Sequence, residues 1–351
     1  MEYPVFIILL LLHFITCGNS KEDSLSMKGM TTTDNPTICP DESDIKPCTC
    51  IVDITNSLIL DCSKVADEDE LTQVFKSYFP QPNFKTFLMR ENKKVKHLTS
   101  NIFGDVSFKV ISMQKGGLKH VSYHTFNNSF ETLEYLDLSS NHLADIPWFG
   151  LHNYTSLNGL HLASNNITSV PSFYCKTLSE IYLGNNSLTG LQTDVFQHLK
   201  HLEHFEMDLA GLTDIVQGTF ADMSHLFSIH LFYNDLTHVP EGTFATSSKK
   251  LQYIYLSYNK ITTVEPDAFP ALPLLEVWLR DNQLVDVEEV VWRPLLEAGG
   301  FLRVKGNPLL CGCDVAWLVR NQTLMSMVDD AACENSDSSL YSLDPEDYKD
   351  C

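Results

Sequence analysis

A hydrophobic pattern that returns about every 24 residues constrains the fold of this chain more than any other feature. Regular copies begin at Leu133 ("LEYLDLSSNHLADIP"), Leu157, Leu178, Leu226 and Leu251, and looser copies begin at Phe84, Phe108, Leu202, Leu274 and Leu302. Within "YLDLSS", alternation places Leu136 and Leu138 on one face and Asp137 on the other, which predicts a half-buried β-strand. One copy is too short to bury its own leucines, so the copies must stack and pair their strands side by side. This repetition overrides the two-domain expectation that 351 residues would otherwise give.

The copies follow L-x-x-L-x-L-x-x-N-x-L, the pattern of a leucine-rich repeat, and their length lies within the range of that class. The predicted fold is therefore an α/β solenoid, a leucine-rich repeat horseshoe of about ten coils with a parallel sheet on its concave face. An asparagine column should satisfy backbone groups of the neighbouring coil: Asn92, Asn141, Asn165, Asn186, Asn234, Asn259, Asn282 and Asn307. Gly116 and Ala210 interrupt this column, and we expect those turns to be weaker. A phenylalanine column is interpreted as packing at the back of the solenoid, not as a cofactor site: Phe103, Phe126, Phe196, Phe220, Phe244 and Phe269.

The beginning of the chain indicates its compartment. Residues 1–20 contain an apolar run from Val5 to Phe14, followed by the small residues Gly18 and Ser20, which predicts a cleaved signal peptide. The run is too short for a transmembrane helix, which needs about 20 apolar residues. We therefore expect a secreted, extracellular protein with no membrane anchor, in which residues 21–38 form a polar N-terminal segment.

Two cysteine clusters flank the repeats. Cys39, Cys48, Cys50 and Cys62 precede them, Cys311, Cys313, Cys333 and Cys351 follow them, and Cys175 lies within them. In a secreted chain such clusters favour disulfides over zinc, although each cluster allows three pairings. Because a solenoid exposes its core at both ends, we interpret residues 39–83 and 311–351 as cysteine caps around repeats at 84–310. Cys175 is expected to be a buried or free thiol.

No enzymatic motif is present: the sequence lacks G-x-S-x-G, H-E-x-x-H, a phosphate-binding glycine loop and a dinucleotide fingerprint. We therefore predict no catalytic residues and no cofactor. The formal net charge of −21 disfavours nucleic acid and anionic membranes as partners. The histidines of "HLKHLEH" (His198, His201 and His204) straddle a loop-to-strand transition, so their side chains should diverge and no metal site is predicted.

The outward residue between the two strand leucines gives the best candidate site. Down the stack it is Leu88, Ser112, Asp137, His161, Tyr182, Glu206, His230, Tyr255, Trp278 and Arg303. Coils about 4.8 Å apart would make the part from Tyr182 to Arg303 one file about 24 Å long. Because Tyr, Trp and Arg are enriched at binding hot spots, we predict a partner-binding surface at Tyr182, Glu206, His230, Phe232, Tyr233, Tyr253, Tyr255, Tyr258, Trp278 and Arg280. His204, Asp208 and Arg303 flank it.

Two further features bear on this surface. Glu206 and His230 are neighbours in the file and imitate an acid–base couple, but an open face does not exclude water, so partner contact or a structural hydrogen bond is favoured. Sequons for N-glycosylation occur at Asn127, Asn153, Asn166, Asn185 and Asn321. Glycans at Asn166 and Asn185 would shield the strand-exit edge and leave the later coils open to a partner.

Several stretches resemble a narrower family. "PCTCIVDITNSLILDCSKVADEDELTQVFKSYFP", "VEEVVWRPLLEAGGFLRVKGNPLLCGCDVAWLV" and "DDAAC…SLDPEDYKDC" are similar to secreted arthropod leucine-rich repeat proteins, a family that includes the non-catalytic subunit of a shrimp luciferase, oplophorus-luciferin 2-monooxygenase. The cysteine arrangement resembles the caps of extracellular leucine-rich repeat proteins. That resemblance implies the pairs Cys39–Cys50, Cys48–Cys62, Cys311–Cys333 and Cys313–Cys351, with Trp317 closing the last coil.

The resemblance implies a secreted accessory protein, because the oxidation of coelenterazine in the luciferase resides in a separate small chain. The sequence thus supports two functions. The first is a non-catalytic scaffold that recognises an extracellular protein or glycan on its concave face. The second is an accessory subunit that stabilises a small secreted oxygenase.

Overall fold

The computed structural model describes residues 38–188, 195–334 and 336–351. The predicted signal peptide and almost all of the polar segment at 21–38 lie outside the described residues. The chain divides into two units, Met1–Ile38 and Cys39–Cys351. Among the described residues, no helix combines the length and the apolar character needed to cross a membrane.

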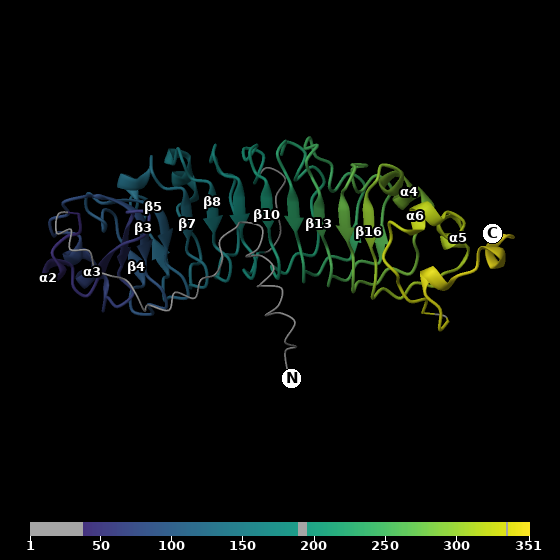
Figure 1. Cartoon of the computed structure of the whole chain (residues 1–351), viewed down its shortest axis with the longest axis horizontal. Coiled ribbons are helices and arrows are strands. Elements are labelled where there is room, and N and C mark those ends of the chain that lie inside the picture. The colour runs from purple at the N-terminus through teal and green to yellow at the C-terminus, as the bar shows by residue number, and fades with distance from the viewer. Residues whose placement is uncertain (1–37, 189–194, 335) are drawn as a thin grey trace. The chain divides into compact units, whose positions relative to one another are not determined.

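A single sheet of twelve strands runs through the described part of the unit and follows chain order (Figure 1). Its strands are β1 (Thr49–Val52), β2 (Leu58–Asp61), β3 (Asn83–Leu88), β5 (Ser107–Ser112), β7 (Tyr135–Asp137), β8 (Gly159–His161), β9 (Glu180–Tyr182), β10 (His204–Glu206), β11 (Ser228–His230), β13 (Tyr253–Tyr255), β15 (Glu276–Trp278) and β16 (Phe301–Arg303). Strands β1 and β2 are antiparallel, and every later pairing is parallel. Two short ladders pair β4 (His97–Leu98) with β6 (His120–Val121) and β12 (His238–Val239) with β14 (Thr263–Val264).

Helices are short and lie mostly in the caps. They are α2 (Glu42–Ile45), α3 (Glu68–Val74), α4 (Glu289–Glu297), α5 (Ala316–Val319) and α6 (Gln322–Met325), with 3₁₀ turns η1 (Asn127–Ser129), η2 (Trp148–Asn153), η3 (Cys313–Val315), η4 (Leu340–Ser342) and η5 (Pro345–Tyr348). In the strands from β7 onward the middle residue is buried while its neighbours are mostly half-buried, as in β13, where Ile254 is inside. The predicted solenoid with a parallel sheet is thus confirmed.

The asparagine column is confirmed as an internal hydrogen-bond ladder. Asn259 is buried, and its Nδ2 donates to the carbonyls of Leu231 and Leu256, both at 2.9 Å. Its Oδ1 accepts from Leu236 N at 3.2 Å. Each asparagine therefore joins its own coil to the preceding one. Ala210 stands where another coil has its asparagine. The backbone N–H groups of Ala210 and Leu212 both donate to Oδ1 of Asn234.

The phenylalanine column packs along the back of the coils, as predicted. Phe244 stacks on Phe220 and on Phe269, with ring centroids 5.8 and 5.1 Å apart. Phe269 in turn stacks on Trp292 of α4 at 5.5 Å, which connects the column to the last helix of the repeats. Offset stacking of this kind adds to the area these rings bury.

Both ends of the solenoid are closed by disulfides. The bonds join Cys39 to Cys50, Cys48 to Cys62, Cys311 to Cys333 and Cys313 to Cys351, the same pairs that the resemblance implied. Cys175 is buried and free, and burial raises its pKa. Trp317 is buried in the C-terminal cap, where its Nε1 donates to Val287 O at 2.9 Å.

Candidate partner-binding surface

The predicted file of outward residues exists on the sheet. Strand pairing places Tyr182 beside Glu206, Glu206 beside His230, His230 beside Tyr255, Tyr255 beside Trp278 and Trp278 beside Arg303. The register holds because the middle residue of each strand is buried, and a slip by one residue would turn every side chain to the other face. Six residues of the file therefore lie in one row across six strands: Tyr182, Glu206, His230, Tyr255, Trp278 and Arg303.

Aromatic rings occupy the C-terminal half of this row. The ring of Tyr255 lies 4.5 Å from His230, 5.0 Å from Phe232 and 5.6 Å from Trp278, between centroids. Tyr253 stacks beside Tyr255 at 5.7 Å. These rings are in mutual contact, so they form one apolar surface and not a set of separate side chains. Phe227, which the sequence analysis missed, extends it, because its ring touches Tyr253 and His204.

A second pair of rings lies at the strand-exit edge. Tyr233 and Tyr258 stack with ring centroids 4.4 Å apart and planes 4° from parallel. Both have a left-handed backbone, with φ of 53° and 60°, which is costly for a bulky residue. The same position holds Ser140, Ser164 and Asp281 in other coils, so the large rings are not required by the turn. Tyr258 is 42% exposed.

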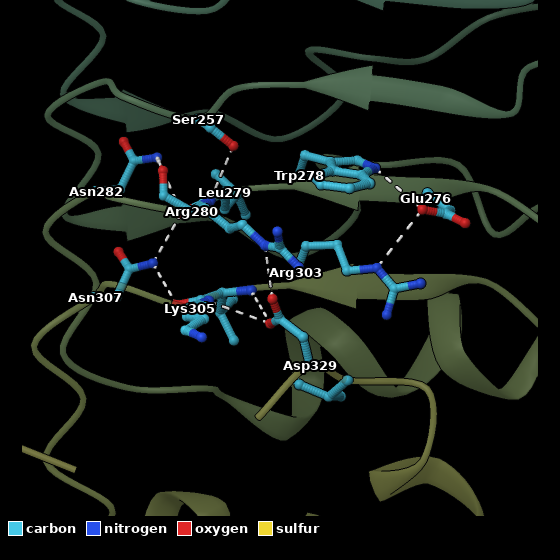
Figure 2. Close-up of polar contacts among 12 residues, drawn as sticks. Ser257, Glu276, Trp278, Leu279, Arg280, Asn282, Arg303, Lys305, Asn307 and Asp329 are labelled. Atoms are coloured by element: carbon cyan, nitrogen blue, oxygen red, sulfur yellow. Dashed lines mark hydrogen bonds and ion pairs between the residues drawn. The ribbon is translucent and has the colours of Figure 1, made fainter. Parts of the chain in front are cut away.

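Arginine and tryptophan form the end of the file (Figure 2). The guanidinium of Arg280 lies 4.7 Å from the ring centroid of Trp278, and that of Arg303 lies 6.0 Å from it. Glu276 accepts a hydrogen bond from Trp278 Nε1 at 3.1 Å and pairs with Arg303 Nε at 3.6 Å. Arg280 Nε donates to Asp329 at 2.8 Å. Two carboxylates therefore fix the orientation of the tryptophan and of both arginines.

Asp329 belongs to the C-terminal cap and performs a second task. Its Oδ1 accepts from the backbone N–H of Val304 at 2.6 Å and of Lys305 at 3.2 Å (Figure 2). In the preceding coil the equivalent N–H, that of Leu279, donates to the carbonyl of Arg303. The Asp329 carboxylate therefore replaces the carbonyl that another coil would supply. The sequence did not predict a role for Asp329 or Glu276. The only signal that could have found them is an acidic residue next to a strand or within the cap.

Glu206 and His230 are adjacent in the sheet, but their hydrogen bonds go elsewhere. Glu206 accepts from the backbone N–H of Gly184 at 3.2 Å and of Asp208 at 3.1 Å. His230 Nε2 is 3.1 Å from Ser228 Oγ. The geometry therefore favours structural hydrogen bonding for both groups, one of the two interpretations (with partner contact) that the sequence preferred over an acid–base couple.

Burial changes the titration of this central region. Desolvation raises the pKa of Glu206, and desolvation together with the neighbouring Glu206 carboxylate raises the pKa of Asp208 well above its usual range. Desolvation and the nearby charge of His204 lower the pKa of His230 to about 3. At neutral pH the middle of the file thus carries a neutral imidazole beside two carboxyl groups that resist ionisation.

Polar groups occupy the preceding coils of the file. The ring of His161 lies 4.4 Å from Tyr182, and its nitrogens face Asp137 at 4.0 Å and Glu180 at 3.8 Å. The neighbouring His161 imidazole is the main reason that the pKa of Glu180 is lowered. Glu180 was not predicted as a site residue. The file therefore changes from acidic and polar to aromatic and then to arginine along the chain.

The three histidines of "HLKHLEH" have different neighbours, as expected. His198 contacts Tyr174, His201 contacts His225, and His204 Nδ1 lies 2.9 Å from Ser228 Oγ. Among the described residues, no group of three or more His, Cys, Asp or Glu is arranged to hold a metal ion. A shallow groove of about 580 Å³ lies at the strand-entry edge and is lined by Tyr135, Lys176, His201 and Glu203, among others.

The sequons lie at differing depths. Asn166 and Asn185 are exposed, and Asn185 Nδ2 donates to Ser164 Oγ of the preceding coil at 3.0 Å. Asn127 and Asn153 are half-buried, and Asn321 caps the N-terminus of α6. Asn185 occupies the same left-handed position as Tyr233, two coils earlier. A glycan there would flank the aromatic surface.

Comparisons with known proteins agree with this architecture. A leucine-rich repeat model matches residues 176–236 and 228–284, and a BspA-type leucine-rich repeat region matches residues 72–203. The non-catalytic subunit of oplophorus-luciferin 2-monooxygenase from Oplophorus gracilirostris is 28% identical over 338 residues, which cover 89% of this chain and 87% of that protein.

Solved structures show the same fold at low identity. A chain in the octameric complex of latrophilin 3, Unc5D and FLRT2 superposes with a TM-score of 0.66 at 20% identity, covering 82% of this chain and 88% of that one. The leucine-rich repeat domain of APL1 gives a TM-score of 0.52 at 20% identity and covers 65% of this chain and 57% of that one.

Proposed function

We propose that this chain, a leucine-rich repeat protein similar over most of its length to a non-catalytic luciferase subunit, is itself a secreted, non-catalytic binding protein. Its partner would be an extracellular protein or glycan held on the open face of the sheet. The observation that carries this proposal is the row of contacting rings from His230 through Tyr255 to Trp278, which ends at Arg303.

The packing of the sheet does not account for these rings. The buried face is already filled by leucines and by the phenylalanine column, so packing does not require rings on the opposite face. Aromatic and arginine side chains are enriched in binding hot spots, and their energy is largest where they are fixed before binding. Here Glu276 fixes both Trp278 and Arg303.

A pair of matched variants tests the proposal. Tyr255→Ala with Trp278→Ala should abolish capture of the partner from the extracellular fluid of the source organism. The control carries Tyr78→Ala and Phe149→Ala, which remove two rings that are 78% and 79% exposed outside the file. A partner that is retained by the control and lost by the test variant supports the proposal. If every captured protein binds the test variant undiminished, the binding surface lies elsewhere.

The likeness to the luciferase subunit supports a second candidate, an accessory subunit for a small coelenterazine-oxidising chain. In that case the purified protein alone should give no light with coelenterazine and oxygen. Adding it to such a catalytic chain should lengthen the half-life of light emission, and Tyr255→Ala with Trp278→Ala should remove the effect. Unchanged half-life with wild-type protein would reject this candidate while leaving the first one open.

A further inference from the structure

The arginine end of the file has features of a preformed acceptor site. Arg280 and Arg303 both lie beside Trp278, and each is held through Nε, by Asp329 at 2.8 Å and by Glu276 at 3.6 Å (Figure 2). Within the described residues, neither guanidinium gives a hydrogen bond from its terminal nitrogens to a protein acceptor. Both side chains remain partly exposed, at 37% and 22%.

A guanidinium held in this way has a defined free edge. Its two terminal N–H groups point in parallel, and this fork matches the two oxygens of a carboxylate. Most of the entropy cost of ordering a long arginine side chain has already been met by the ring contact and the Nε bond. A surface lysine would offer neither property.

We propose that the free guanidinium edges of Arg280 and Arg303 each offer a fork that receives a carboxylate side chain, Asp or Glu, of a protein partner on the open face of the sheet. The proposal rests on the proposed function and names the chemistry of the partner at that same site. Glu276 and Asp329 act as positioning residues, because they orient the arginines and their charges balance the two guanidinium groups.

The surroundings favour a protein carboxylate over an acidic glycan. Strand register places Trp278 between Tyr255 and Arg303, and Arg280 lies over the ring as well, so little ring face remains for a sugar to stack on. A polyanionic glycan would also be repelled by a chain of net charge −21, whereas a partner protein can present one carboxylate on a neutral or basic surface. Apolar side chains beside that carboxylate would meet Tyr255 and Phe232.

The test uses a random 12-residue peptide phage library panned on the immobilised full chain. Selected peptides are then synthesised, and their Kd is measured by fluorescence anisotropy. We expect them to share an Asp or Glu, and we expect Arg280→Lys or Arg303→Lys to weaken binding at least about tenfold, because lysine keeps the charge but loses the fork. Converting the acidic residue of the peptide to its amide should have a similar effect. Arg90→Lys, an exposed arginine outside the file, should change nothing.

The outcomes separate this inference from the proposed function. Peptides that Trp278→Ala weakens, but that tolerate both lysine variants and the amide, would overturn the fork and leave the aromatic surface intact. A library that gives no peptide sensitive to Trp278→Ala would overturn both. Thermal midpoints of the lysine variants serve as the fold control, since lysine can still pair with the carboxylates of Asp329 and Glu276.

Discussion

Acid should destabilise this protein through His230. The imidazole is 9% exposed, and desolvation together with the charge of His204 lowers its pKa to about 3. Since an unfolded histidine titrates near 6.5, the unfolded chain binds more protons than the folded chain between those two values. Stability should therefore be unaffected above pH 6.5 and should fall as the pH drops below it.

The size of the effect follows from the shift. One unit of pKa corresponds to about 1.4 kcal/mol, so the full shift is worth at most roughly 5 kcal/mol. At pH 4.5, which is two pH units below the pKa of an unfolded histidine, this destabilisation amounts to about 3 kcal/mol. For a chain of this size we expect the thermal midpoint to fall by about 5 °C from this source.

The assay compares the thermal midpoint of the wild type with that of His230→Gln between pH 8 and pH 4.5, by circular dichroism. Glutamine stays neutral and can still bond Ser228, whose Oγ lies 3.1 Å from the imidazole. The difference between the two proteins should be constant above pH 7 and should shift in favour of the variant below pH 6.5. His238→Gln, at an exposed position, is the control. Parallel curves for wild type and His230→Gln over the whole range would refute the reasoning.

Three further perturbations probe the file, the ladder and the cap. Asp208→Asn should raise the thermal midpoint at pH 8, because burial disfavours the charged Asp208 carboxylate in the folded chain, and this gain should vanish below pH 3.8. An equal gain from Asp222→Asn, at an exposed position, would contradict this reasoning. Asn259→Ala leaves three backbone groups, Leu236 N, Leu231 O and Leu256 O, without their partner and should lower the free energy of unfolding, measured in urea, by about 3 kcal/mol. A loss under about 1 kcal/mol would show that water replaces these hydrogen bonds. Cys351→Ser removes the disulfide to Cys313, which closes a loop between residues 38 apart and stabilises the folded chain by up to about 4 kcal/mol. Limited proteolysis should therefore cleave the variant after Cys313 faster than the wild type, and equal rates would mean that the disulfide does not hold the terminus.

The sequence predicted the solenoid and the row of outward residues because both depend only on local period. Alternation within "YLDLSS" fixes which side chains are inside, and stacking at one register then aligns Tyr255 with Trp278. The asparagine ladder was equally accessible, because an amide after a strand has few partners other than neighbouring backbone. The cap disulfides were not derivable in this way, since spacing alone left three pairings in each cluster and only resemblance selected among them.

The contacts that give the surface its properties could not be read from the repeat. Glu206 and His230 are neighbours in the file, as predicted, but the Glu206 carboxylate accepts hydrogen bonds from the backbone N–H groups of Gly184 and Asp208, which the period does not predict. The period predicts which side chains share a face, and it says nothing of how each one rotates on that face. Rotation depends on burial and on hydrogen bonds, which differ from coil to coil.

Asp329 shows why the cap and the binding face should be considered together. The last coil has no successor, so the N–H groups of Val304 and Lys305 would lack an acceptor if the cap did not supply one. The same carboxylate holds Arg280 across 49 residues of sequence, at 2.8 Å. Closing the solenoid and orienting the arginine thus depend on one side chain. Another coil in place of the cap could supply a carbonyl acceptor, as Arg303 does for Leu279, but it would not supply the Asp329 carboxylate that holds Arg280.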